Sequence, residues 1–290
     1  MNVAVVGHGF VGEAVCNGLC GTEDITGYDT KKGIFLYRYG KMDRHIDIYT
    51  IEDMGKWFDI VVNSDIIFLC LPTPMGEDGE CDVSIVEKVV EDIDKEARRQ
   101  GKFPILIIKS TVVPGTTKRL SGKCENCIVF FNPEFLTEAN YIEDYKNQDR
   151  IILGLTGDLC IDKVKELFAK AFPDVPIYET SSTVAELVKY TTNCFLTVKV
   201  SFANEMFRIC EELLGDASMY DEVIRLACLD KRLGDTHWKV PGPDGKKGWG
   251  GSCFPKDLSA LIHFASSVMP HGTMDGARLT NQAVREEGTV

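Results

Sequence analysis

The sequence has no hydrophobic run near the roughly 20 residues that a membrane-spanning helix needs, and its longest, Ile66–Leu71, is typical of a buried strand. It is also poor in basic side chains, with 32 Lys and Arg against 44 Asp and Glu, a net charge of −12. Such an acidic surface repels a phosphate backbone and disfavours nucleic acid as a partner. Since no charged leader or cleavage site follows Met1, we expect a cytoplasmic protein. The hydrophobic content of 44% excludes a disordered chain.

The sequence also lacks the regular cysteine pairs of a secreted, disulfide-rich protein. Its eleven cysteines are odd in number and scattered, which predicts reduced thiols. Cys124 and Cys127 form a close pair, but none of the five histidines is spaced to complete a zinc site with them. We therefore predict no metal centre and interpret this pair as coincidental.

Short β-branched runs alternate with amphipathic stretches over the first part of the chain. Short, wholly apolar strands separated by helices are typical of a parallel sheet that is covered on both faces. The pattern predicts an α/β fold with a Rossmann-like, doubly wound parallel sheet over residues 1–179. The expected strands are Val3–Val6, Asp24–Tyr28, Ile66–Leu71, Ile105–Ile108, Ile128–Phe131 and Ile151–Leu155, and the expected helices include Ser84–Arg99 and Asp162–Phe172.

The character of the sequence changes near residue 180. The run Ser181-Ser182-Thr183 precedes Glu186 in a capping-box arrangement, and neither glycine nor proline follows until Gly215. This predicts a long helix over residues 181–214. Further helical patterns at 220–229 and 257–267 predict an all-helical second domain over residues 180–290.

A glycine turn, Gly7-His8-Gly9-Phe10-Val11-Gly12, follows the first strand and opens a helix, and Asp29 closes the next strand. Gly7 allows the tight turn, Gly9 lets a pyrophosphate approach the backbone, and Gly12 lets the helix pack on the strand. The helix N-terminus offers free N–H donors to the phosphates. Asp29 is placed to accept hydrogen bonds from ribose hydroxyls, which predicts NAD rather than NADP.

Cys253 stands just ahead of a predicted helix, where Pro255 suits the first helical position. The dipole and the unpaired N–H groups of a helix start stabilise a thiolate. The glycines just upstream let a substrate come close to the sulfur. The alternative is a small buried cysteine beside a helix cap, with Asp257 as an ordinary acid of the first turn.

Lys189 and Asn193 are four residues apart in the predicted long helix, so they share one face. The same face continues through Leu196 and Val200 and is therefore directed to a core. A lysine and an amide on such a face are costly unless they have partners or line a cleft. The other possibility is that Lys189 extends to solvent, and the spacing does not decide between them.

Polar residues follow three of the predicted strands, at the edge where ligands bind in open α/β folds. Asn132-Pro133 predicts a helix entry, so Glu134 and Glu138 are expected on one helical face, where two close carboxylates can raise one pKa. Acids are also simply favoured in a first helical turn. The runs Pro72-Thr73-Pro74 and Lys109-Ser110-Thr111 are expected to line a cofactor crevice.

Together these motifs resemble the UDP-glucose 6-dehydrogenase family, the UDP-glucose/GDP-mannose dehydrogenases. The motifs occur in the family's order and cover nearly the whole chain. They are Gly7 to Gly12 with Asp29, Pro72-Thr73-Pro74, Lys109-Ser110-Thr111, Asn132-Pro133-Glu134-Phe135-Leu136 with Glu138, Ala185-Glu186-Leu187-Val188-Lys189 with Asn193, and Gly250-Gly251-Ser252-Cys253-Phe254-Pro255-Lys256-Asp257.

The resemblance implies a twofold oxidation of a nucleotide-bound hexose with NAD. It implies Cys253 as nucleophile, Lys189 and Asn193 as oxyanion holders, Asp257 and Thr111 as groups that position or deprotonate through water, and Glu134 and Glu138 as aids to thioester formation and hydrolysis. The predicted cofactor-binding residues are Gly7, Gly9, Phe10, Val11, Gly12, Asp29, Pro72, Thr73, Ser110, Thr111 and Glu138. The predicted substrate-binding residues are Phe135, Leu136, Lys189, Asn193, Arg232, Trp249 and Gly250.

The substrate expected first is UDP-glucose, with GDP-mannose and UDP-N-acetylhexosamines left open. Residues 231–250 carry a net charge of +3, which suits a diphosphate, although a solvated loop with coincidental charge would look the same. Family members usually carry a third α/β domain that contacts the nucleotide, and the printed sequence does not contain one. The resemblance also implies a homodimer through the helix 181–214. Two alternatives are a single-step β-hydroxyacid-type dehydrogenase and a dimeric NAD-binding module that needs a partner chain.

Overall fold

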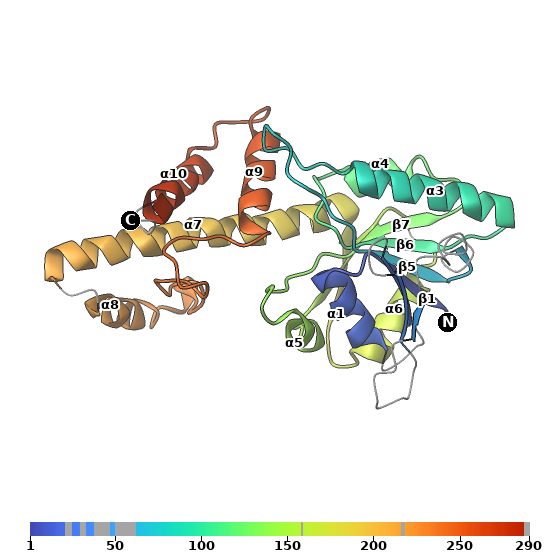
Figure 1. Cartoon of the computed structure of the whole chain (residues 1–290), viewed down its shortest axis with the longest axis horizontal. Helices are drawn as coiled ribbons and strands as arrows, with labels where there is room; N and C mark the ends of the chain where they lie inside the picture. Colours follow the sequence, from blue (N-terminus) through green and yellow to red (C-terminus); the bar gives the residue numbers. More distant parts are fainter. Residues whose placement is uncertain are drawn as a thin grey trace. The chain divides into compact units, whose positions relative to one another are not determined.

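The computed structural model describes residues 1–20, 25–29, 33–37, 47–49, 62–157, 159–215 and 218–286 (Figure 1). The expected strand start at Asp24 lies outside them. The chain divides into two compact units. Unit 1 is Met1–Pro74 with Asp82–Lys189, and unit 2 is Met75–Cys81 with Tyr190–Val290. The predicted domain boundary after residue 179 stays a prediction. The two compact units divide between Lys189 and Tyr190, inside the long helix. The sequence did not indicate that residues 75–81 belong to unit 2.

Unit 1 contains a sheet whose nine described strands follow the order β4-β3-β2-β1-β5-β6-β7-β8-β9. The central strands β2, β1, β5, β6 and β7 are parallel, which confirms the Rossmann-like fold. Antiparallel pairs occur on both sides of this centre, between β2 and β3, β3 and β4, and β7 and β8. The strands are β1 (Val3–Val6), β2 (Ile25–Asp29), β3 (Gly33–Tyr37), β4 (Asp47–Tyr49), β5 (Ile66–Leu69), β6 (Ile105–Ile108), β7 (Ile128–Phe131), β8 (Ile151–Leu155) and β9 (Ile177–Ser181).

The core of unit 1 has two layers because successive strand side chains point to opposite faces of the sheet. Val3 and Val5 of β1 pack in one cluster with α1 and α6, and Ala4 and Val6 pack in the other with α3. Figure 1 shows α3 and α4 on one face of the sheet and α1 and α6 on the other. The helices of this unit are α1 (Phe10–Leu19), α3 (Ser84–Gln100), α4 (Thr116–Ser121), α5 (Tyr141–Lys146) and α6 (Ile161–Ala171).

The regular elements described in unit 2 are helices, apart from an isolated bridge between Met75 and Cys81, and the unit is built on the long helix α7 (Ser182–Leu214), which begins in unit 1. The predicted helix over residues 181–214 is confirmed, except that Ser181 ends β9 and the helix begins one residue later. Phe207 of α7 packs with Tyr220, whose hydroxyl donates to the carbonyl of Trp238 at 2.6 Å. No described helix is both long enough and apolar enough to span a membrane. The other elements are α8 (Met219–Ala227), the 3₁₀-helix η2 (Lys231–Leu233), α9 (Phe254–Ala265) and α10 (Gly272–Glu286).

The start of α7 differs from the predicted capping box. The Glu186 carboxylate accepts hydrogen bonds from the backbone N–H groups of Gly115 at 2.5 Å and Thr117 at 2.8 Å. It therefore caps α4, a helix about seventy residues earlier in the chain, instead of its own helix. Burial raises the pKa of Glu186, and the hydrogen bonds from Thr117 and Gly115 only partly offset this effect. The prediction was wrong because local spacing cannot show a distant helix end that competes for the same carboxylate.

Candidate active site

Most of the predicted cofactor residues lie at one edge of the sheet in unit 1. Strands β1, β5, β6 and β7 run parallel in register, so their carboxyl ends meet at this edge. Buried Thr73 follows β5, beside the more exposed Pro72. Ser110 follows β6 and joins the two strand ends, since its hydroxyl accepts from the N–H of Leu71 at 2.8 Å and donates to the Leu71 carbonyl at 2.7 Å. Half-buried Thr111 comes next.

Glycine occupies the three positions of the turn for different reasons. Gly7 has a φ of +92°, and a Cβ there would lie 2.3 Å from the carbonyl oxygen of Cys70. A Cβ on Gly12 would lie 1.9 Å from the carbonyl oxygen of Gly7, so the close start of α1 requires glycine. A Cβ on Gly9 would meet no heavy atom within 4 Å among the described residues. Packing explains Gly7 and Gly12, whereas the open space at Gly9 fits a ligand that approaches the backbone.

Asp29 ends β2 beside this turn. Its Oδ2 accepts a hydrogen bond from the backbone N–H of His8 at 3.0 Å. The carboxylate is thus held next to the glycine turn and the start of α1, where Phe10 and Val11 form the first turn. A dinucleotide needs this combination of an acceptor for the ribose and N–H donors at a helix start for the phosphates, so the residues present fit NAD.

A buried ion pair lies in the same unit, where Lys189 of α7 meets Glu134 after β7. The Lys189 Nζ is 2.8 Å from Glu134 Oε1 and 2.7 Å from the Glu134 carbonyl oxygen, and it lies 5.7 Å from the ring centroid of Phe135. The two charged side chains are 4% and 5% exposed. Lys189 therefore does not extend to solvent, and the structure excludes that alternative.

The electrostatics of Glu134 differ from the expected carboxylate pair. Burial alone would raise its pKa, but the charge and hydrogen bond of Lys189, the N–H of Leu136 and the charge of Lys109 outweigh it, so the pKa of Glu134 is lowered. The Leu136 N–H donates to Glu134 Oε2 at 2.7 Å. Glu134 is accordingly an ionised carboxylate whose negative charge is held against the Lys189 ammonium.

The helix entry predicted at Asn132-Pro133 is absent, because residues 132–137 have no regular structure and α5 begins only at Tyr141. The Glu134 carbonyl binds Lys189, and the Asn132 side chain is engaged elsewhere, so neither is available to start a helix. Glu138 is exposed in the turn before α5. The expectation that Glu134 and Glu138 share a helical face was therefore wrong.

Lys109 belongs to the run predicted to line the crevice, but the sequence assigned it no role, and the structure shows that its side chain is buried. Its Nζ donates to Asn132 Oδ1 at 2.7 Å and lies 5.4 Å from the ring centroid of Tyr145. The Asn132 amide in turn donates to the carbonyl of Ile152 at 2.8 Å, which fixes the segment that leads to Glu134. Burial lowers the pKa of Lys109 to about 8, against the charges of Cys70 and Glu134, which raise it. Its position directly after the wholly apolar strand β6 could have indicated in the sequence that Lys109 is buried.

Unit 2 contains the predicted nucleophile. Cys253 is the N-cap of α9, half-buried, and its carbonyl accepts from the N–H of Asp257 at 2.8 Å. Asp257 is almost fully buried, and its Oδ2 accepts from the Asn193 amide at 2.6 Å while Oδ1 pairs with Lys256. The structure therefore holds Asn193 of α7 against Asp257, which pairs with Lys256 in the first turn of α9. Pro255 occupies the second helical position, one residue later than predicted, because α9 begins at Phe254.

The predicted substrate residues have varied surroundings. Trp249 is buried, with its indole N–H bound to Ser201 Oγ at 2.9 Å and its carbonyl to Arg285, so its side chain ties the loop 231–250 to α7. Gly250 is constrained by Arg285, because a Cβ there would lie 2.7 Å from a guanidinium nitrogen. Arg232 is exposed and paired with Asp230. In unit 1, half-buried Phe135 lies 4.3 Å under the guanidinium of Arg150, and neighbouring Leu136 packs against the core.

These features together define a protein of the dinucleotide-binding dehydrogenase class. The NAD-binding domain model of the UDP-glucose/GDP-mannose dehydrogenase family matches residues 55–172, and the central-domain model of the same family matches residues 183–283. The chain belongs to this family.

Individual relatives agree with this assignment. The chain is 32% identical over 295 aligned positions to the UDP-glucose 6-dehydrogenase YwqF of Bacillus subtilis, covering 92% of this chain and 62% of that protein. It is 33% identical over 218 positions to the UDP-glucose 6-dehydrogenase AglM of Haloferax volcanii, covering 71% and 49%. The structure of a UDP-glucose dehydrogenase from Pyrobaculum islandicum matches with a TM-score of 0.78 and 28% identity, over 97% of this chain and 68% of that one. The chain thus spans about half to two thirds of the length of these relatives.

Proposed function

We propose that this chain carries out the NAD-dependent, twofold oxidation of C6 of a nucleotide sugar, with UDP-glucose converted to UDP-glucuronate as the first candidate. The observation that carries the proposal is the thiol of Cys253 at a helix start, directly ahead of the buried Asn193–Asp257 hydrogen bond. A single oxidation of an alcohol needs no thiol. A second oxidation is aided by one, because an aldehyde must first add a nucleophile to become a species that can release hydride.

The first oxidation removes a proton from the C6 hydroxyl and a hydride from its carbon. NAD, when bound at the glycine turn beside Asp29, supplies the acceptor for that hydride. Asp257 is proposed to take the hydroxyl proton through a water, and Thr111 is proposed to act as a positioning group. The ammonium of Lys189 stabilises the negative charge that develops on the oxygen, assisted by the Asn193 amide.

The second oxidation uses Cys253. Its thiolate adds to the aldehyde carbon and forms a thiohemiacetal. Loss of the hydroxyl proton and of a second hydride, for which a second NAD would be the acceptor, converts it to a thioester. Water attacks the thioester carbon, the C–S bond breaks, and the carboxylate product leaves with the thiol restored. Glu134, whose carboxylate and carbonyl hold the Lys189 ammonium, is proposed to assist thioester formation and hydrolysis by positioning that positive charge. Glu138 is proposed to assist hydrolysis from the exposed turn.

The reaction is tested by assaying the full chain with NAD and a panel of nucleotide sugars, with NADH and product both quantified. Two NADH for each uronic acid formed is the expected result. One NADH for each product molecule would instead support a single-step dehydrogenase. NAD binding without reduction by any member of the panel would contradict the proposed activity for this chain.

The proposed cofactor site predicts a specific effect of Gly9→Ala. Because a Cβ at this position meets no described atom, the variant should fold normally, with an unfolding temperature close to that of the parent chain. The methyl group would occupy the space proposed for the pyrophosphate, so the dissociation constant for NAD should rise about tenfold or more. Calorimetric titration with NAD and thermal unfolding provide the two readouts.

Gly12→Ala is the matched comparison, because its Cβ would collide with the Gly7 carbonyl and should lower stability directly. Unchanged NAD affinity in Gly9→Ala would contradict the proposed position of the pyrophosphate.

We further propose that a second copy of this chain covers the exposed apolar side of α7. Phe195, Phe202 and Ile209 recur every seven residues and are 65%, 51% and 46% exposed, and Leu213 is 76% exposed. A seven-residue repeat places side chains in one stripe along a helix, which is typical of helix pairing.

This stripe predicts a homodimer that charge can disrupt. The double variant Phe195→Glu/Phe202→Glu should be a monomer in size-exclusion chromatography with light scattering, because burying two carboxylates in an apolar interface is unfavourable. Leu159→Glu, at an equally exposed position of unit 1, should leave the parent state unchanged. A monomeric parent chain at micromolar concentration would contradict the proposed dimer.

A further inference from the structure

Cys124 and Cys127, in the loop between α4 and β7, are brought together with Asp94 of α3. The two sulfur atoms and an Asp94 carboxylate oxygen all lie within 4.8 Å of one another. The Cys127 Sγ is 3.4 Å from Asp94 Oδ1. The sequence spacing showed only the two cysteines, and the fold adds an acid from about thirty residues earlier.

Asp94 holds the turn that carries the two thiols. Its Oδ1 accepts hydrogen bonds from the backbone N–H groups of Glu125 at 3.1 Å and Asn126 at 2.7 Å, the two residues between the cysteines. The carboxylate thereby fixes the backbone in a conformation that keeps both sulfur atoms on one side. Two thiols held this close need little further ordering to form a bond.

The two thiols are chemically unequal. Cys124 is half-buried, whereas Cys127 is 5% exposed. The Cys127 thiol donates to Asp94 Oδ1. Interaction with Cys127 lowers the pKa of Cys124, whereas interaction with Cys124, burial and the Asp94 charge raise the pKa of Cys127. An accessible thiol with a lowered pKa beside a buried thiol is the arrangement of an attacking and a resolving cysteine.

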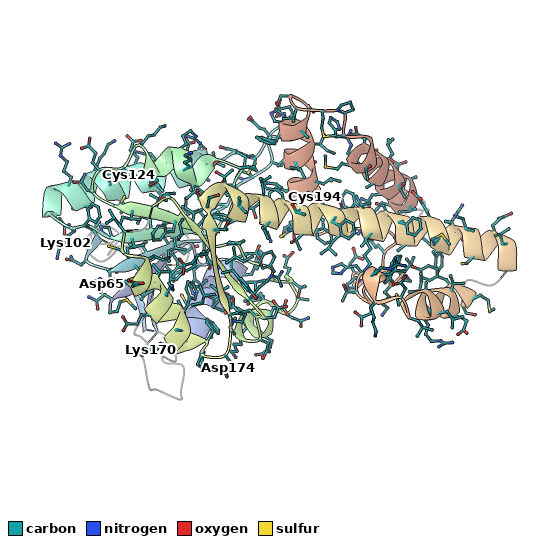
Figure 2. The ribbon with its side chains drawn as sticks, turned by 180° about the vertical axis from the view of Figure 1, so that it is seen from behind. Asp65, Lys102, Cys124, Lys170, Asp174 and Cys194 are labelled. Carbon is teal, nitrogen blue, oxygen red and sulfur yellow. The ribbon has the colours of Figure 1, made fainter. Side chains whose placement is uncertain are left out.

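We propose that Cys124 and Cys127 form a reversible intramolecular disulfide by exchange with a low-molecular-weight disulfide, with Cys124 as the attacking thiol. The pair lies at the amino end of β7, next to Asp94 at α3. Figure 2 shows Cys124 toward the same side of unit 1 as Asp65 and Lys102, which precede β5 and β6. This is the sheet edge opposite the glycine turn, so the proposal concerns a separate site and does not depend on the proposed oxidation of a sugar.

The exchange balances in two steps with oxidised glutathione. The Cys124 thiolate attacks one glutathione sulfur, the S–S bond of glutathione breaks, and one reduced glutathione leaves. The Cys127 sulfur then attacks Cys124 Sγ, after its proton passes to the nearby Asp94 carboxylate, and expels the second reduced glutathione. Two protein thiols are oxidised, one glutathione disulfide is reduced, and the two thiol protons end on the two released glutathione molecules.

The test uses the full chain, incubated with oxidised glutathione, alkylated and digested with trypsin. The peptide Cys124–Lys146 contains both cysteines and no other. In the parent chain this peptide should become lighter by two hydrogens, resist alkylation and keep no glutathione, and reduction should restore two alkylation sites. In Cys127→Ser, glutathione should remain attached to Cys124. In Cys124→Ser, Cys127 should react with glutathione at least about ten times more slowly, because that thiol is buried.

Cys160→Ser, which removes an exposed thiol of the same unit, is the matched control and should leave the disulfide unchanged. The proposal is overturned if the peptide of the parent chain still takes two alkyl groups under conditions that modify Cys160. It is also overturned if that peptide retains glutathione. Stoichiometric zinc binding that protects both thiols from oxidised glutathione would overturn it as well, and would assign the cluster to a metal instead.

Discussion

Cys253→Ala should stop the formation of the uronic acid while the chain remains folded. The side chain is half-buried at the N-cap of α9, so its removal leaves a small change in packing. Without the thiol no thiohemiacetal forms, and the aldehyde has no covalent route to its second oxidation. We expect the rate of uronic acid formation to fall by about a thousandfold or more, the scale typical of removing a covalent nucleophile. NADH release and product analysis with UDP-glucose measure this effect.

The matched control is Cys228→Ala, which removes another half-buried thiol beside a helix end in the same unit. Its turnover and NADH stoichiometry should equal those of the parent chain. Unfolding curves of both variants separate lost chemistry from lost structure. Cys253→Ala that still yields two NADH for each product at the parent rate would exclude the thioester mechanism.

Strands β1, β5, β6 and β7 could be predicted from the sequence because they are apolar at every position. β1, β6, β7 and β8 have the predicted bounds, and β5 ends two residues earlier than predicted. β9 was missed because it lies at the edge of the sheet, where its residues are mostly exposed and carry no apolar run. That β8 runs antiparallel to β7 also could not be inferred, because an apolar run does not indicate the direction of its strand relative to the neighbouring strand.

The parts of the candidate site whose conformation depends on neighbouring residues could be predicted from the sequence. The parts whose conformation depends on a contact with a distant residue could not. The glycine turn and the N-cap position of Cys253 follow from neighbouring residues alone. The conformation of residues 132–138 does not, because Lys189, 55 residues away, binds both the carbonyl and the carboxylate of Glu134. The need to pair a buried charge therefore outweighs the local preference for a helix at these residues.

The same ion pair predicts the largest change in stability. Lys189→Met would leave the Glu134 carboxylate buried without its main partner, since the two side chains are almost fully enclosed. Breaking a buried pair by removing one partner costs about 3–5 kcal/mol in unfolding free energy. Urea-induced unfolding of the full chain at pH 7.5 measures this loss, and sugar oxidation should be lost with it.

The pH dependence of that loss has a definite sign. In the parent chain the pKa of Glu134 is lowered, so its contribution to stability is present above the pKa of the unfolded chain and is lost as the pH falls through the folded value. In Lys189→Met burial dominates and should raise the pKa of Glu134, so the folded state takes up a proton more readily than the unfolded chain. The stability difference between variant and parent should therefore narrow as the pH is lowered from 7.5 toward 5.

Two comparisons make this prediction specific to the buried pair. The double variant Lys189→Met/Glu134→Gln removes both charges and should recover part of the lost stability at pH 7.5. Lys88→Met breaks an exposed pair with Asp92 on α3, whose lysine side chain is 66% exposed, and should cost no more than about 0.5 kcal/mol. Equal losses in Lys189→Met and Lys88→Met would contradict a buried charge pair, because they would mean that solvent reaches Glu134 and replaces its partner.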